Sequence, residues 1–474
     1  MVVLIKNKEE KIKMKNDRWT KFLGNIKNFK NLQTPITYAF FTIVVAGSMY
    51  YLAFNTSLIS SSTLYDATQL VTASTNAILG EASNASNGTI DGSKVDSLIP
   101  TKPALPPPLV ITHIDTPKQV KAIYMTSWVA GTPSLRKKLV DLIDKTEVNS
   151  VVIDIKDYSG RLVFKVFDPY LKEIGSEEIR VSDFREFIAD MHKRGIYVIG
   201  RVAVFQDAYM VKHMPKYAVT TRTGADKGEI WHDKKGIPWI DAGAEPVWEY
   251  IVSIAKESYL AGVDEINFDY IRFPSDGNMN DIAYPWSKTS KKSEVLDSFF
   301  AYLQSQLSAV EIKNNPDDAL IGYTQAQTGT VKIPISADLF GMVTTNTDDL
   351  NIGQLLEVGL KHFDYVAPMV YPSHYPATFM GFPNPAAKPY EVVQYSMKRA
   401  VERAEAASTS PKKLRPWLQD FSINGTHYTA DMVKAQIKAT YDVGLDSWMI
   451  WNASNKYTDG AFLPETKEVV TLPK

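Results

Sequence analysis

The sequence contains no cysteine, so disulfide bonds, thiolate metal sites and cysteine nucleophiles are excluded together. Histidine is also scarce. The seven histidines are scattered along the chain, and we expect no histidine-based metal site. A cation site built from Asp carboxylates stays open. No feature of the sequence points to a cofactor, and we expect none.

Four common catalytic motifs are absent as well. The chain has no H-E-x-x-H, no Walker A loop and no G-x-S-x-G, and no G-x-G-x-x-G follows its first predicted strand. These absences argue against a zinc metallohydrolase, a P-loop nucleotidase, a serine hydrolase with a nucleophile elbow and a dinucleotide-binding fold.

The net charge is only −1, but its distribution is uneven. Residues 1–33 contain nine basic and three acidic side chains, a net charge of +6, which leaves −7 for the rest of the chain. Duplex nucleic acid binds to a basic face, so this mildly acidic body argues against nucleic acid as a partner.

A long uncharged segment follows the basic tail. Residues 34–55 are mostly apolar, and about 20 such residues cross the roughly 30 Å hydrocarbon core of a bilayer. The basic residues precede this segment and no charge follows it until Asp66, which predicts a cytoplasmic N-terminus. We therefore expect a single-pass cell-membrane protein with a cytoplasmic tail at 1–33, a transmembrane helix at 34–55 and the remainder outside the cytoplasm. A cleaved signal peptide is the alternative, although its basic region and apolar core are normally shorter.

Residues 56–116 predict a flexible stalk. They are rich in Ser, Thr, Asn and Ala and then in Pro, a composition that buries too little apolar surface to offset the entropy of ordering. The proline run near the end favours an extended, semi-rigid chain. A short helix over Leu64–Ala82 stays open.

From residue 117 to 474, short apolar runs alternate with amphipathic stretches. Eight runs predict strands at Lys121–Thr126, Ser150–Ile155, Ile196–Val202, Glu265–Ile271, Ile335–Phe340, Tyr365–Val370, Arg415–Leu418 and Ser447–Trp451. Seven stretches predict helices at Ser134–Lys145, Val181–Arg194, Glu245–Ala261, Lys292–Val310, Gly353–Leu360, Tyr390–Ala406 and Asp431–Val443. Strands that alternate with helices pair in parallel, and eight such units predict an α/β fold of the (β/α)8 TIM-barrel type. A doubly wound open sheet is the alternative, and we interpret Ala319–Tyr323 as part of an insertion although it also fits a strand.

The fourth predicted strand carries a row of polar residues. Alternation places Ile266, Phe268 and Tyr270 toward the helices, and Glu265, Asn267 and Asp269 inside the barrel. An unpaired buried charge costs several kcal/mol, so the inward groups must be paired or serve a site. Active sites of such barrels lie at the C-terminal ends of the strands, which makes Asp269 the leading functional candidate. A buried ion pair that only supports the interior is the alternative.

The neighbouring strands supply partners for Asp269. Asp154 on the second strand and Arg201 on the third face the same interior, and Asp157 follows just beyond the second strand. An Arg at the barrel mouth would keep one carboxylate ionised by lowering its pKa. The same charges also fit a supporting role behind the site.

Further polar and aromatic residues accumulate at the ends of the later strands. They are Asp338 on the fifth strand, Tyr371 and His374 after the sixth, Trp417 and Asp420 around the seventh, and Trp451 and Asn452 at the eighth. One such residue would be chance, whereas their accumulation at one end of a barrel predicts a site.

Most glycoside hydrolases use two carboxyl groups that flank the glycosidic bond. One protonates the leaving oxygen, and the other either attacks the sugar or activates a water molecule. Asp269 and Asp338 are the first candidates, with Asp154 and Asp420 in reserve. If Asp338 is the acid, burial or a neighbouring charge must raise its pKa. The side chains expected to stack on sugar rings are Trp128, Trp231, Tyr371, Trp417 and Trp451, although each also fits a packed core.

The sequence blocks around these strands are distinctive. They read K-A-I-Y-M-T, V-V-I-D-I-K-D-Y-S-G, Y-V-I-G-R-V-A-V-F-Q-D, D-E-I-N-F-D-Y-I-R-F-P, S-A-D-L-F-G and D-Y-V-A-P-M-V-Y-P-S-H-Y. In this order, over residues 119–455, the chain resembles the putative glycosyl hydrolase domain family of the TIM-barrel glycosidase superfamily. The resemblance implies the barrel fold and a carbohydrate substrate. The matched positions include Asp154, Asp157, Arg201, Asp269, Arg272, Asp338, Tyr371, Pro372 and His374.

We therefore predict a membrane-anchored glycoside hydrolase that acts on an extracellular or cell-wall polysaccharide. Its predicted catalytic residues are Asp269, Asp338 and Asp154. Its predicted substrate-binding residues are Asp157, Arg201, Arg272, Tyr371, His374, Trp417, Asp420, Trp451 and Asn452. Two alternatives stay open because a fold does not decide function: a non-catalytic barrel that binds glycan for cell-wall attachment, and a structural envelope protein whose barrel is only a scaffold.

Overall fold

The computed structural model describes residues 107–465, apart from 225–226, 315–321 and 424. The predicted tail at 1–33, the predicted transmembrane helix at 34–55 and most of the predicted stalk lie outside the described residues. Within the part of the chain that is described, no helix is long and apolar enough to cross a membrane. The anchor and its orientation therefore stay predictions, as does the stalk up to residue 106. The last part of the predicted stalk is wrong, because Leu109–Ile111 form a strand that pairs with Tyr323–Gln325 and Ile111 is only 2% exposed.

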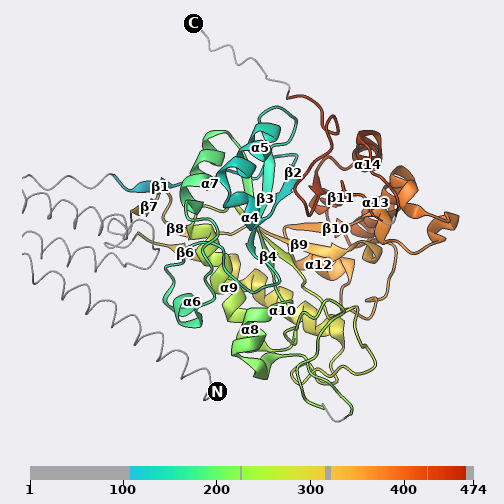
Figure 1. Cartoon of the computed structure of the whole chain (residues 1–474), viewed down its shortest axis with the longest axis horizontal. Coiled ribbons are helices and arrows are strands. Elements are labelled where there is room, and N and C mark those ends of the chain that lie inside the picture. Colours follow the sequence, from blue (N-terminus) through green and yellow to red (C-terminus); the bar gives the residue numbers. More distant parts are fainter. Residues whose placement is uncertain (1–106, 225–226, 315–321, 424, 466–474) are drawn as a thin grey trace, which may run out of the picture. The chain divides into compact units, whose positions relative to one another are not determined.

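A closed barrel of eight parallel strands lies at the centre of the described chain (Figure 1). In chain order the strands are β2 (Lys121–Met125), β3 (Ser150–Lys156), β4 (Tyr197–Ala203), β5 (Glu265–Asp269), β9 (Ile335–Phe340), β10 (Tyr365–Met369), β11 (Trp417–Gln419) and β12 (Trp448–Trp451). Each strand falls within two residues of its predicted bounds, so the barrel prediction is confirmed. The open-sheet alternative is wrong, because β12 pairs with β2 and closes the sheet.

Helices surround the barrel (Figure 1). The seven predicted helices are confirmed as α5 (Pro133–Ile143), α7 (Phe184–Lys193), α9 (Glu245–Leu260), α10 (Lys292–Leu307), α12 (Leu356–His362), α13 (Pro389–Ala406) and α14 (Ala430–Asp442). Three short helices, α4 (Ser127–Ala130), α6 (Pro169–Ile174) and α8 (Ala208–His213), lie in connecting segments and have no counterpart in the sequence prediction. They are too short to show a clear helical period.

Four short strands lie outside the barrel. β1 (Leu109–Ile111) pairs in parallel with β7 (Tyr323–Gln325), and β6 (Val310–Ile312) pairs antiparallel with β8 (Gly329–Val331). Three of them, β6, β7 and β8, belong to the connection between α10 and β9. Tyr323, which ends the ambiguous run at 319–323, thus lies in an insertion as predicted, and residues 319–321 lie outside the described residues.

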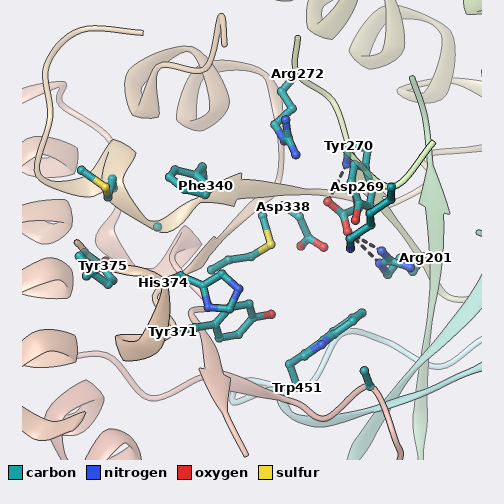
Figure 2. Close-up of a pocket in the computed structure, with 15 residues that line it drawn as sticks. Arg201, Asp269, Tyr270, Arg272, Asp338, Phe340, Tyr371, His374, Tyr375 and Trp451 are labelled. Atoms are coloured by element: carbon teal, nitrogen blue, oxygen red, sulfur yellow. Dashed lines mark hydrogen bonds and ion pairs between the residues drawn. The ribbon is translucent and has the colours of Figure 1, made fainter. Parts of the chain in front are cut away.

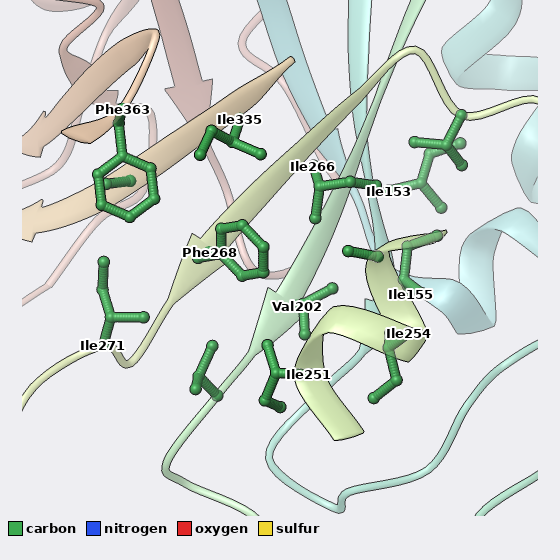
Figure 3. Packing of buried hydrophobic residues seen from close by; sticks show 14 of the residues in the cluster. Ile153, Ile155, Val202, Ile251, Ile254, Ile266, Phe268, Ile271, Ile335 and Phe363 are labelled. Atoms are coloured by element: carbon green, nitrogen blue, oxygen red, sulfur yellow. The ribbon is translucent and has the colours of Figure 1, made fainter. Parts of the chain in front are cut away.

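Alternation along the strands separates two packed layers. Ile266 and Phe268 of β5 face outward and pack with Ile251 of α9 in the cluster between barrel and helices (Figure 3). A second buried cluster, which includes Val152 and Ile199, fills the inside of the barrel. The inward positions of β5 are then left for its polar residues, as the sequence predicts.

A buried ion pair occupies the N-terminal end of the barrel interior. Arg415 Nη1 lies 2.8 Å from Glu265 Oε2, and the side chains are only 2% and 1% exposed. The hydroxyl of Tyr197 also donates to Glu265 Oε2 at 3.1 Å. The first residue of the predicted polar row is therefore paired rather than free, and this end of the barrel serves the stability of the fold.

Replacing Arg415 by Met should strongly destabilise the barrel, because it leaves the Glu265 carboxylate buried without its countercharge. We expect Arg415→Met to lower the free energy of unfolding by about 3–5 kcal/mol. Urea denaturation of the full-length chain, followed by circular dichroism, measures this loss.

The matched control is Arg194→Met. Arg194 pairs with Asp144, but these side chains are 39% and 36% exposed, so we expect a loss under about 1 kcal/mol. The double variant Arg415→Met/Glu265→Gln should regain part of the loss. Equal unfolding midpoints for the two single Arg variants would contradict the importance of the buried pair.

Candidate active site

Arg201 of β4 joins carboxylates from two neighbouring strands. The register pairs it with Asp154 of β3, and Ala203, two residues later, pairs with Asp269 of β5. Its Nη1 donates to Asp154 Oδ1 at 2.6 Å, while its Nε and Nη2 donate to Asp269 Oδ2 at 3.0 and 2.6 Å. The hydroxyl of Tyr124 donates to the other oxygen of Asp154 at 2.5 Å. The three predicted charges thus meet around one buried guanidinium.

Asp338 lies beside Asp269 on the adjacent strand. The register of β5 with β9 brings the two residues to matching positions. Oδ1 of Asp338 accepts a hydrogen bond from the side-chain amide of Asn267 at 2.9 Å and one from the indole N–H of Trp417 at 2.7 Å. Oδ2 accepts none from the described residues, so one oxygen is held and the other stays available to a ligand.

The two neighbouring carboxyls have opposite surroundings. Burial, and then the charge of Asp269, raise the pKa of Asp338 well above its usual value, although hydrogen bonds from Asn267 and Trp417 act to lower it. Asp269 instead faces Arg201. Burial acts to lower the pKa of Arg201, but the charges of Asp269 and Asp154 outweigh it and hold this pKa well above normal. The arrangement favours a protonated Asp338 beside a carboxyl that is paired with Arg201, and a raised pKa of Asp338 is what the sequence requires if Asp338 is an acid.

These groups face a cavity of about 350 Å³ at the C-terminal ends of the strands (Figure 2). Figure 2 shows Asp269 and Asp338 pointing into it, with Arg272 on one side and Tyr371 and Trp451 on the other. The predicted site residues that line this cavity are Arg201, Asp269, Arg272, Asp338, Tyr371, His374 and Trp451. Seven residues that the sequence places at or near strand ends therefore line one cavity.

A second cavity of about 700 Å³ adjoins the first over the loops after β11 and β12. Tyr371, His374 and Trp451 line both cavities, so the two adjoin, and we call them together the groove. The predicted residues Asp420 and Asn452 line the second cavity only. Burial raises the pKa of Asp420, although hydrogen bonds from Thr458 oppose the rise. Asp420 is thus placed along the groove rather than beside the carboxyl pair.

Three predicted site residues stand behind the cavity walls. Asp154 is 3% exposed and lies behind Arg201, and Asp157 pairs with Arg180 at 2.6 Å in the loop after β3. Trp417 is fully buried beneath Asp338, so its ring has no face to offer a sugar. Trp231 is 2% exposed, so the prediction that it stacks on a sugar is likewise wrong. Trp128 is 61% exposed on α4 and lines neither cavity, and its stacking stays a prediction.

Tyr270 and Lys235 are among the lining residues of the site that the sequence did not predict. Tyr270 is predicted to face the helices, but β5 ends at Asp269 and Tyr270 has a left-handed φ of 54° that turns its ring into the cavity lining. Lys235 lines both cavities from the long connection between α8 and α9. Because Lys235 follows no barrel strand, strand alternation gives no signal for it.

His374 stands where the two cavities meet. Burial, and then the charge of Lys235, lower the pKa of His374 and favour the neutral ring at neutral pH. A neutral imidazole can accept a hydrogen bond from a hydroxyl group. Among the described residues, no group of three or more His, Asp or Glu side chains is placed to hold a metal ion.

Comparison with known proteins gives a family and a fold. The family model described as "Putative glycosyl hydrolase domain" matches residues 122–457. No curated protein matches the chain. Among solved structures, the chain is similar to the PgaB (BpsB) glycoside hydrolase domain from Bordetella bronchiseptica, with 12% identity, 71% of this chain and 95% of that chain covered, and a TM-score of 0.50. This likeness supports the barrel fold.

Two further solved structures are similar over parts of the chain. A hypothetical protein from Ruminiclostridium thermocellum ATCC 27405 is 32% identical over 39% of this chain and 92% of its own, with a TM-score of 0.36. The spore cortex-lytic enzyme SleL of Bacillus megaterium QM B1551 is 9% identical over 75% of this chain and 74% of its own, with a TM-score of 0.39.

The pKa of Asp338 should move in opposite directions in two variants. Trp417→Phe removes a hydrogen bond that stabilises the carboxylate, so we expect the pKa of Asp338 to rise further. Asp269→Asn removes the neighbouring negative charge, so we expect it to fall. Carboxyl 13C NMR titration of protein labelled at Asp, with the signal assigned through Asp338→Asn, measures both shifts.

Trp248→Phe is the matched control, because its indole donates to the carbonyl of Ala242 on the helical side, away from the carboxyls. It should leave the titration of Asp338 unchanged. Shifts of the same sign in Trp417→Phe and Asp269→Asn would show that unfolding, rather than local electrostatics, dominates the response.

Proposed function

The chain belongs to the Putative glycosyl hydrolase domain family, and from this premise we propose that it hydrolyses glycosidic bonds with Asp269 and Asp338 as its catalytic carboxyls. We further propose that its substrate is an extracellular or cell-wall polysaccharide. The observation that carries the proposal is the contrast between these two neighbouring groups, one paired with Arg201 and the other with a strongly raised pKa.

Because of this contrast, the two carboxyls have different roles in hydrolysis. Protonated Asp338 is the general acid that donates its proton to the leaving oxygen, while ionised Asp269 acts on the opposite side of the reacting carbon. Asp338 is 1% exposed and Asp269 is 6% exposed, so both act in a largely water-free setting. Arg201 is a positioning residue that holds Asp269 in place through two hydrogen bonds.

The strand positions favour retention of anomeric configuration. Neighbouring strands are about 4.8 Å apart, and side chains at matching positions on one face have a similar spacing. Retaining hydrolases place their carboxyls about 5 Å apart, whereas inverting ones leave roughly 6.5–9.5 Å for a water molecule. Asp269 would then be the nucleophile: its oxygen forms a bond to the anomeric carbon as the leaving oxygen takes the Asp338 proton. Water, deprotonated by Asp338, then releases the sugar.

The groove offers aromatic surface for sugar rings. Trp451 stacks on Tyr124 at 3.9 Å between ring centroids and lines both cavities, together with Tyr371. Flat apolar rings next to polar groups suit the apolar faces and hydroxyls of a sugar. Because the groove continues beyond the carboxyl pair, we propose a polymeric rather than a single-sugar substrate.

One observation favours a different function. Asp269 accepts two hydrogen bonds from Arg201 on one oxygen and one from the backbone N–H of Tyr270, at 2.6 Å, on the other. A carboxylate held in this way also suits a barrel that binds glycan without cleaving it. The second candidate function is therefore a non-catalytic cell-wall attachment module.

Asp269→Asn and Asp338→Asn should each abolish hydrolysis. The measurement is product release by the full-length chain from a panel of polysaccharides and peptidoglycan, with the anomer of the first product identified by NMR. We expect each variant to lower turnover by about 10³-fold or more, because each removes one of two groups the reaction needs. The wild type should release the retained anomer.

Asp141→Asn is the matched control, since Asp141 pairs with Lys137 on the exposed side of α5 and faces neither cavity. It should leave turnover unchanged. Wild-type binding to glycan without any product would overturn the enzyme proposal in favour of the attachment module. Full turnover in Asp269→Asn would remove that residue from the reaction, and an inverted first product would exclude it as the nucleophile.

We also propose that residues 34–55 anchor the chain in the cell membrane, with the N-terminus in the cytoplasm and the barrel outside. The basic tail, the uncharged apolar run and the absence of charge until Asp66 support this orientation. A polymer outside the cell would then reach the groove without crossing the membrane.

The lack of native cysteine gives a clean test of this topology. In intact cells, a membrane-impermeant maleimide should label Lys138→Cys on the exposed face of α5 but leave Lys8→Cys in the tail unlabelled. Both should react after lysis. Labelling of both in intact cells would overturn the orientation, and release of a shortened chain into the medium would favour a cleaved signal peptide.

A further inference from the structure

Arg272 brings a positive charge to the catalytic cavity that no carboxylate of the described residues pairs with. Its guanidinium lies 5.0 Å from the ring centre of Trp239 and 5.5 Å from that of Tyr270. Its Nη1 donates to the carbonyl of Phe273 at 3.1 Å and to Ser275 Oγ at 3.0 Å. Its Nε and Nη2 donate to no atom of the described chain, although the side chain lines the cavity.

Burial makes the charge of Arg272 unfavourable. Burial lowers the pKa of Arg272, and charges at some distance, including Asp269, only partly offset that effect. A partly buried guanidinium without a paired anion is unfavourable. An anionic group on a bound ligand would supply the missing partner.

Lys235 adds a second free charge at the same mouth. The turn that carries it is held by Asp233, whose Oδ1 accepts the backbone N–H groups of Lys235 and Ile237, each at 2.9 Å. The other Asp233 oxygen accepts from Gln206 at 2.8 Å and from Trp239 at 3.0 Å. Four hydrogen bonds of Asp233 thus hold the turn, while the Lys235 ammonium has no hydrogen-bond or ion-pair partner among the described residues and lines both cavities.

The positive charge continues along the groove. Lys456 lines the second cavity and, within the described chain, its ammonium has no ion-pair partner either. This contrasts with the rest of the molecule, because the chain after residue 33 carries a net charge of −7. Three unpaired cations in one groove of an acidic protein form a local field that attracts anions.

We infer that the substrate is an acidic glycan, and that a carboxylate on the sugar next to the cleaved bond binds Arg272 and Lys235. The inference rests on the proposed function, since it names the substrate class of the same site. The planar fork of Arg272 matches a carboxylate with two parallel hydrogen bonds, and Lys235 supplies a point charge in the same cavity. Neutral sugars would leave both cations unpaired in the bound state.

The first arm of the test changes the substrate and leaves its linkage intact. Full-length protein is given polygalacturonate, alginate and hyaluronan, each beside its carboxyl-reduced form, together with neutral, phosphate-bearing and sulfate-bearing polysaccharides. We expect an acidic carboxylate polymer to be cleaved fastest. Its carboxyl-reduced form should show a kcat/KM lower by about 10- to 100-fold, the usual effect of losing a hydrogen bond to a charged group.

The second arm changes the protein. Arg272→Gln should lower kcat/KM for the acidic polymer by about 10- to 100-fold, and should lower it by a smaller factor for the reduced polymer. Arg272→Lys should recover part of the loss. Lys235→Gln should weaken the salt dependence of kcat/KM, since it removes one steering charge. Lys138→Gln removes an equal charge from exposed α5, outside both cavities, and should change neither.

Failure of this inference differs from failure of the proposed function. Equal cleavage of acidic and reduced polymers, or fastest cleavage of a neutral one, would overturn the acidic substrate and leave the hydrolase standing. Preference for a phosphate or sulfate polymer would overturn the carboxylate. If no polymer is cleaved, calorimetric binding of oligogalacturonate against its reduced form decides the inference, with equal affinities overturning it.

Discussion

The Arg201 guanidinium, buried between Asp154 and Asp269, is the interaction on which the mouth of the barrel depends. A cation inside a barrel is unfavourable unless carboxylates surround it, and a carboxylate there is unfavourable unless a cation does. Strand register brings the three groups together, because β3, β4 and β5 are neighbours and alternate residues of each face inward. At the other end of the barrel, Arg415 and Glu265 form a second buried ion pair, which supports the fold rather than a site.

The same network gives two chemically similar residues different properties. Arg201 faces Asp269, whereas Asp338, on the next strand, receives neutral donors and the repulsion of Asp269. One carboxyl is thereby suited to hold a proton and the other a charge, the division that glycoside hydrolysis requires. Arg272 and Lys235 line the same cavity, and no carboxylate of the described residues pairs with either of them. One cavity is therefore lined by two carboxyls with different surroundings and by two unpaired cations.

Sequence reasoning failed where a side chain's direction depends on something other than strand alternation. Tyr270 turns into the cavity because the chain leaves the strand through a left-handed conformation. Trp417 sits at a strand start and becomes part of the interior, where its N–H serves Asp338 rather than a sugar. Lys235 enters the site from a distant connection that only the folded chain brings over the barrel mouth. None of these placements follows from local periodicity, since each depends on long-range packing.

The sequence by itself determined the barrel, because eight apolar runs separated by amphipathic stretches can bury their surface in few other ways. It also determined that Asp154, Arg201, Asp269 and Asp338 face one interior, since alternation along a strand leaves no choice of side. Tertiary structure alone decided which of them line the cavity and that Asp338 is the carboxyl with the strongly raised pKa. Those properties arise from neighbours far apart in the chain, whose charges and burial set each pKa only after the barrel has closed.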